Sequence, residues 1–141
     1  MKTRVIASLA AATLGALALV PPAAARDPAV GAKEFARCKA CHAIVADDGT
    51  EIVTGGKVGP NLYGVVGRTV GGLAGFRYKD PIVAVGESGL VWDEAELAAY
   101  MTDPKAWLVE KTGDPAARTG MTFKQQSKQA DLAAYLASVV R

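Results

Sequence analysis

The motif that most constrains this chain is Cys38-Lys39-Ala40-Cys41-His42, because it contains both cysteines and the single histidine of the sequence. A disulfide between cysteines this close closes almost no loop and adds little stability. A structural zinc site needs four ligands, and the motif offers only its two thiols and one imidazole. A thioredoxin-like redox pair normally follows a β-strand, and no strand pattern precedes Cys38.

The same spacing, C-x-x-C-H, is typical of covalent haem attachment. Two thiols on one helical turn can add to the two vinyl groups on one side of a haem. The following histidine then lies under the iron and supplies its proximal nitrogen. We therefore predict one haem c, attached by thioethers to Cys38 and Cys41 and ligated by His42. A small redox or interaction module without haem is the alternative.

The first 25 residues have the pattern of a secretory signal peptide. Lys2 and Arg4 precede the uncharged run Val5–Val20, which two prolines end, and small residues follow up to Ala25. An uncleaved anchor is the alternative, but a spanning helix needs about 20 apolar residues. We predict cleavage after Ala25, one domain over residues 26–141, and a periplasmic location.

The formal net charge of +2 is explained by the predicted export signal. Without Lys2 and Arg4, the remaining chain carries 14 basic and 14 acidic residues and is formally neutral. Net charge therefore predicts no nucleic-acid partner. No later run is apolar and long enough for stable membrane insertion.

Apolar spacing predicts a small, mostly helical and loop-rich domain. Glu96 follows Asp93 by three residues, which is a capping-box pattern for a helix that ends before Pro104. Gly49–Gly75 lacks helical periodicity and predicts loops and turns, and strand patterns are weak throughout. A loop-rich chain of this length is short of apolar core, so we expect a bound group to fill its centre. The other predicted helices are Pro28–Cys38, Pro104–Glu110 and Ser127–Val140.

Elimination leaves two candidate residues for the second iron ligand. With one histidine in the chain, two histidine ligands are excluded, and only Met101 and Met121 remain after residue 25. Met101 lies on the apolar stripe of a capped helix, where core packing is the ordinary role. Met121 lies in a loop, which can present a thioether to the iron, with gap filling in the core as the alternative. We predict Met121, because His/Met ligation suits electron transfer.

Residues 31–136 resemble the class I c-type cytochromes, most closely the soluble bacterial cytochrome c2 type. The resemblance implies an all-α fold of about four to five helices and Gly-rich loops wrapped around one covalent haem. The segment Lys105–Gly120 is longer than in short mitochondrial-like members, which favours the larger bacterial subgroup. The motifs that carry the resemblance are Gly31 with Phe35, CKACH, Gly59-Pro60-Asn61-Leu62-Tyr63-Gly64, Gly67-Arg68, Gly75-Phe76-Arg77-Tyr78, Val91-Trp92, Asp103-Pro104-Lys105, Thr119-Gly120-Met121 and Asp131–Leu136.

The resemblance also implies roles for single residues. The Pro60 carbonyl would accept the hydrogen of His42 Nδ1. Tyr100 would direct its hydroxyl toward the Met121 sulfur. Gly31 and Phe35 would cross the last helix at Leu132 and Tyr135. Donors to the haem propionates would be Arg68, Tyr78, Trp92 and Thr119; ordinary packing is the alternative for each aromatic residue taken alone.

These features predict a periplasmic one-electron carrier and no enzyme, because both axial positions are filled and no nucleophile–base pair stands out. An enzyme or gas-binding haem protein with an open sixth position is the alternative. We expect a monomer that exchanges electrons with a quinol-oxidising complex, a terminal oxidase or a photosynthetic reaction centre. The contact face would be the edge near Cys41, Phe123 and Lys124.

Charge distribution predicts how such partners are steered. Basic residues are expected near the haem edge, and acidic residues mostly elsewhere. Lysines scattered over a solvated surface are the alternative. The basic set is Arg37, Lys39, Lys57, Lys105, Lys111, Lys124 and Lys128, and the acidic set is Asp47, Asp48, Glu87, Asp93, Glu94 and Glu96.

Overall fold

The computed structural model describes residues 26–140, so the predicted signal peptide over residues 1–25 lies outside the described residues. The described chain forms five α-helices, one short 3-10 helix and a two-stranded sheet. None of these helices is long and apolar enough to cross a membrane. The elements are α1 (Pro28–Glu34), η1 (Phe35–Arg37), β1 (Ile44–Val45), β2 (Glu51–Val53), α2 (Asp80–Glu87), α3 (Glu94–Thr102), α4 (Pro104–Thr112) and α5 (Gln129–Ser138).

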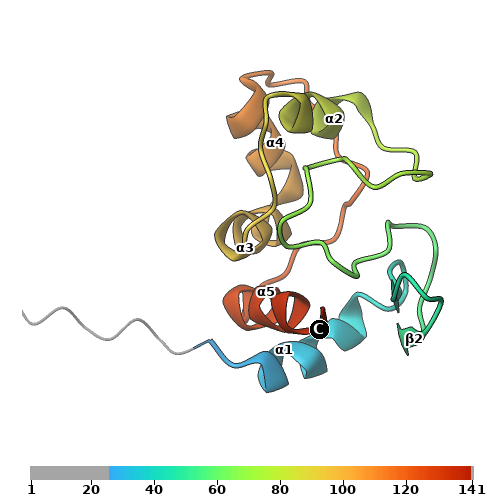
Figure 1. Ribbon diagram of the computed structural model, residues 1–141. Helices are drawn as coiled ribbons and strands as arrows, with labels where there is room; N and C mark the ends of the chain where they lie inside the picture. The colour runs from blue at the N-terminus through green and yellow to red at the C-terminus, as the bar shows by residue number, and fades with distance from the viewer. Residues whose placement is uncertain (1–25, 141) are drawn as a thin grey trace, which may run out of the picture.

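Helices α1 and α5 lie against each other at one end of the molecule (Figure 1). Their close approach requires glycine, because a Cβ atom at Gly31 would lie 2.1 Å from the carbonyl oxygen of Asp131. One turn further on, the ring of Phe35 lies 5.8 Å from that of Tyr135, centroid to centroid. The crossing predicted from Gly31 and Phe35 is therefore confirmed.

Helix α3 packs on α5, and α4 continues from α3 after a sharp turn. The Asp93 carboxylate caps α3 by accepting from the amide of Glu96 at 2.7 Å. The predicted capping box is wrong in its second half, because the Glu96 carboxylate instead accepts from the indole of Trp107. Pro104 begins α4, and the Asp103 carboxylate caps it.

Four elements differ from the sequence predictions. Helix α2 was not predicted, and it packs against α4, with Gly86 seated on the backbone of Val70. The predicted N-terminal helix changes to 3-10 geometry at Phe35, and the last helix is shorter at both ends than predicted. The glycine-rich stretch contains β2, which pairs antiparallel with β1.

The core lies between the helices and continues into the long loops. Its buried aromatic residues are Phe35, Trp92 and Trp107. Several partly buried apolar side chains pack against this core from the segments between helices. They include Cys38, Leu62, Tyr63 and Met121, and Tyr100 packs against the core from α3.

Candidate functional site

Cys38, Cys41 and His42 lie on one tight turn directly after η1. The amides of Cys41 and His42 both donate to the carbonyl of Cys38, at 3.0 and 2.9 Å. Both cysteines are free thiols. Burial raises the pKa of the Cys38 thiol to about 11, with smaller contributions from Cys41 and Glu34. A thiol held protonated at neutral pH lacks the low pKa of a thioredoxin-type nucleophile.

His42 is held in one orientation by the segment that crosses it. Its Nδ1 lies 2.8 Å from the carbonyl oxygen of Pro60. Burial lowers the pKa of the imidazole, and the hydrogen bond to Pro60 offsets only part of this effect. The neutral ring therefore donates from Nδ1, and its Nε2 lone pair is free to bind a metal.

Glycine lets that segment lie on the ring. A Cβ atom at Gly59 would be 2.3 Å from His42 Cε1 and 2.7 Å from Nε2. The Gly59 amide also donates to the Cys41 carbonyl at 2.8 Å. The loop thus covers one side of the imidazole.

The two methionines occupy different environments. Met101 is a core residue of α3 with 7% of its surface exposed, as its place on an apolar stripe predicts. Met121 is partly buried and lies on the segment between α4 and α5. The Thr119 hydroxyl accepts from the Met121 amide at 3.0 Å and donates to its carbonyl at 2.9 Å. The Tyr100 hydroxyl contacts Thr119 Oγ1 at 3.4 Å, so Tyr100 reaches the Met121 segment through Thr119.

Arg68 and Trp92 are brought together by backbone pairing between two distant segments. The Trp92 amide donates to the Arg68 carbonyl at 2.8 Å, next to an isolated bridge between Thr69 and Val91. The half-buried Arg68 guanidinium donates to the carbonyls of Asn61 and Tyr63. Among residues 26–140 no carboxylate forms an ion pair with it.

Arg68 and Tyr78 lie together and are both partly withdrawn from solvent. Burial raises the pKa of the Tyr78 hydroxyl, and the nearby Arg68 charge partly opposes this shift. Burial also lowers the pKa of Arg68. A partly desolvated cation beside a protonated hydroxyl, without an internal counter-ion, fits a carboxylate supplied by a bound group.

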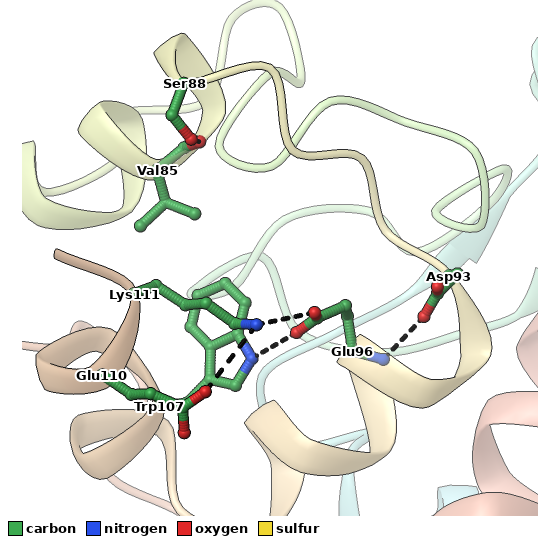
Figure 2. A network of polar contacts seen from close by, with 7 residues as sticks. All are labelled: Val85, Ser88, Asp93, Glu96, Trp107, Glu110 and Lys111. Carbon is green, nitrogen blue, oxygen red and sulfur yellow. Dashed lines mark hydrogen bonds and ion pairs between the residues drawn. The ribbon is translucent and has the colours of Figure 1, made fainter.

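A polar network not anticipated from the sequence surrounds Trp107 (Figure 2). The Trp107 ring stacks on Trp92 at 5.1 Å between centroids, and Tyr100 meets both rings edge-on. The Glu96 carboxylate accepts from Trp107 Nε1 and from Lys111 Nζ, each at 2.7 Å. The sequence signal for this cluster was Trp107, which lies three residues after Pro104, the first residue of α4.

The charge pattern is only partly as predicted. Lys111 forms an ion pair with Glu96, so a member of the basic set and a member of the acidic set lie together. Lys124 binds the Asp103 carboxylate at 2.6 Å. In the described part of the chain, three lysines of the basic set form no ion pair with a carboxylate: Lys39, Lys57 and Lys105.

The residues present fit a covalently held haem. They supply two thiols on one turn, an oriented imidazole, a partly buried thioether on the segment between α4 and α5, and an arginine without an ion-pair partner among the described residues. No cluster of three His, Cys, Asp or Glu side chains suited to a bare metal ion exists among residues 26–140. A small helical domain with this arrangement defines the class I c-type cytochromes.

Comparison with known proteins agrees with this class. The chain is 59% identical over 134 residues to cytochrome c2 of Rhodobacter capsulatus, covering 95% of this chain and 98% of that protein. It is 59% identical over 130 residues to cytochrome c-550 of Paracoccus versutus, covering 89% and 84% of the two chains. No protein-family model matches.

Solved structures give the same result. The structure of Rhodobacter capsulatus cytochrome c2 superposes with a TM-score of 0.80 at 59% identity, covering 82% of this chain and 99% of that chain. Ferric cytochrome c-550 from Paracoccus versutus gives 0.77 at 60% identity, covering 79% and 95%. The chain belongs to the cytochrome c2 family. It is accordingly an electron carrier and not an enzyme, and its cofactor is one covalent haem c.

Proposed function

We propose that this protein is a periplasmic one-electron carrier whose haem is held by Cys38 and Cys41 and ligated by His42 and Met121. The supporting observation is the hydrogen bond of 2.8 Å between His42 Nδ1 and the Pro60 carbonyl, which leaves Nε2 as the free nitrogen. The haem iron supplies the chemistry by cycling between its ferrous and ferric states.

The residues around the haem iron set its reduction potential. Burial keeps His42 neutral, and the hydrogen bond to the Pro60 carbonyl fixes its ring, which maintains a constant proximal ligand. The Met121 thioether is a soft ligand that favours the reduced state and raises the reduction potential. With His42 and Met121 both holding the iron, no position would be left for a substrate.

Arg68 and Tyr78 are suited to bind the haem propionates. The Arg68 guanidinium is half-buried and has no carboxylate partner among the described residues, so a propionate would offset its desolvation. Trp92 is a further donor in this proposal, and Thr119 becomes one when its hydroxyl turns away from the Met121 carbonyl. The stacked Trp107 fixes the plane of Trp92.

Export and partners follow from the sequence. Removal of residues 1–25 would deliver the chain to the periplasm, where electrons pass between membrane complexes such as a quinol-oxidising complex, a terminal oxidase or a photosynthetic reaction centre. Lys39 is exposed within the attachment turn, and the exposed Lys57 lies near it because the neighbouring Gly56 amide donates to the Lys39 carbonyl. We expect them to steer docking onto acidic surfaces.

Two methionine variants test the ligand assignment. In the oxidised protein a thioether bound to iron gives a weak absorption band in the far red. Met121→Ala is expected to lose this band and Met101→Ala to keep it. Met101→Ala is the matched control, because it removes the same side chain from the core. Loss of the band in Met101→Ala alone would contradict the assignment of Met121.

A further inference from the structure

Gln125 is a buried polar side chain on the segment that carries Met121. Only 1% of its surface is exposed, and it lies four residues after Met121, before α5 begins. Burial of an amide is unfavourable unless the amide is hydrogen-bonded. The partners of Gln125 therefore indicate why a polar residue occupies this position.

The side-chain amide joins this segment to the helix before the attachment turn. Gln125 Nε2 donates to Glu34 Oε2 at 2.9 Å and to the Ser127 carbonyl at 2.9 Å. Glu34 is the last residue of α1 and lies four residues before Cys38. One side chain thus connects the two stretches of chain that supply the haem attachment and the distal ligand.

The backbone of Gln125 is fixed at two further points. Its amide donates to the carbonyl of Met101 on α3 at 2.8 Å. Its carbonyl accepts from Nε2 of Gln129 on α5 at 2.7 Å. Together with Glu34, these contacts tie the residue to α1, α3 and α5.

The turn that follows Gln125 is strained and needs such ties. Lys128 has φ of 63°. Among the described residues, it is the single residue other than glycine whose φ is positive. A side-chain-bearing residue adopts this left-handed conformation only where its surroundings hold it there. The Gln125 bond to the Ser127 carbonyl and the Leu132 amide bond to the Lys128 carbonyl, at 3.0 Å, hold the two ends of this turn.

We propose that Gln125 is a positioning residue for Met121, which it fixes by linking the distal segment to Glu34 at the end of α1. The inference rests on the proposed ligation by Met121. When the link is absent, the segment keeps its backbone contacts but gains freedom, so competing ligands displace the thioether more easily.

The test uses the oxidised holoprotein and the variant Gln125→Leu, which keeps side-chain size and removes the amide. Raising the pH supplies hydroxide and neutral amines that compete with the thioether. We expect the far-red band to disappear about one pH unit lower than in the unaltered protein, a tenfold weaker Met121 ligation. The midpoint of denaturant unfolding is expected to fall only slightly, because leucine also removes the buried Gln125 Oε1, which has no hydrogen-bond partner among the described residues, and Glu34 keeps its ion pair with Arg37 at 3.7 Å.

Two variants at Glu34 provide an independent test. Glu34→Gln retains an acceptor for Gln125, so the pH at which half of the far-red band is lost is expected to stay as in the unaltered protein. Glu34→Ala removes the acceptor and is expected to shift the midpoint as Gln125→Leu does, with no further shift when the two are combined. The matched control is Gln126→Leu, because the exposed Gln126 amide reaches only the Lys124 carbonyl, at 3.4 Å.

The outcomes separate this inference from the proposed function. An unchanged pH midpoint in Gln125→Leu, or additive shifts in the double variant, would overturn the role of Gln125. Absence of the far-red band in the unaltered protein at neutral pH would instead overturn the ligation by Met121, on which the inference depends.

Discussion

The crossing of α1 and α5 gives a sharp prediction for the substitution Gly31→Ala. The new Cβ atom would lie 2.1 Å from the carbonyl oxygen of Asp131, 2.6 Å from its carbonyl carbon and 2.7 Å from Tyr135 Cβ. Two of these atoms belong to backbone, which cannot rotate away as a flexible side chain can. To restore ordinary contact the helices must separate by about 1 Å.

The cost follows from two opposing effects. Overpacking against rigid atoms costs about 3 kcal/mol, the upper end of the usual range. Alanine in a helix interior returns about 1 kcal/mol relative to glycine. Gly31→Ala should therefore lower the free energy of unfolding by about 2 kcal/mol, or about 8 °C in Tm for a domain of this size.

Thermal unfolding of the holoprotein, followed by circular dichroism, measures this loss. Gly120→Ala is the matched control, because Gly120 has no positive φ and its nearest neighbours are Lys79 side-chain atoms at 3.8 and 3.9 Å. The control should keep its Tm. A Gly31→Ala protein that also kept its Tm would refute the close-approach reasoning.

Three further predictions concern charge and packing. The hydrogen bond from Lys124 lowers the pKa of Asp103 below its ordinary value. The ionised carboxylate therefore stabilises the fold above about pH 4. This stabilisation is lost as the pH falls through the lowered pKa that Asp103 has in the folded protein. Asp103→Asn, which keeps the helix cap, should flatten the decline in denaturant midpoint on acidification. Glu96→Leu leaves the buried Trp107 indole without its acceptor and should cost about 2 kcal/mol in denaturant unfolding. Lys39→Glu should slow electron transfer to an acidic partner complex at low salt, and equal rates at all ionic strengths would exclude steering by this residue.

Features set by neighbours in the chain could be predicted from the sequence. The attachment turn, the Asp93 cap and the start of α4 at Pro104 each depend on residues within a few positions, and the structure contains them. Helix α2 was missed because its sequence, with valines and Gly86, favours a helix weakly. Packing of Gly86 on the Val70 carbonyl supplies what local propensity lacks.

Features set by distant segments could not be predicted in the same way. Glu96 was expected to return to its own helix cap, but Trp107 and Lys111 from α4 offer stronger donors once α3 and α4 pack. Gln125 and Gln126 look alike in the sequence, yet only Gln125 is buried. Its burial depends on three helices that meet around it.

We propose that Cys38, Cys41, His42 and Met121 build the closed site of a one-electron carrier. Spectroelectrochemical titration of the purified holoprotein tests whether the site is closed. We expect one haem per chain and a single reversible one-electron transition, with identical curves on reduction and reoxidation. Hysteresis between the two curves, or a transition accompanied by uptake of an external ligand, would contradict it.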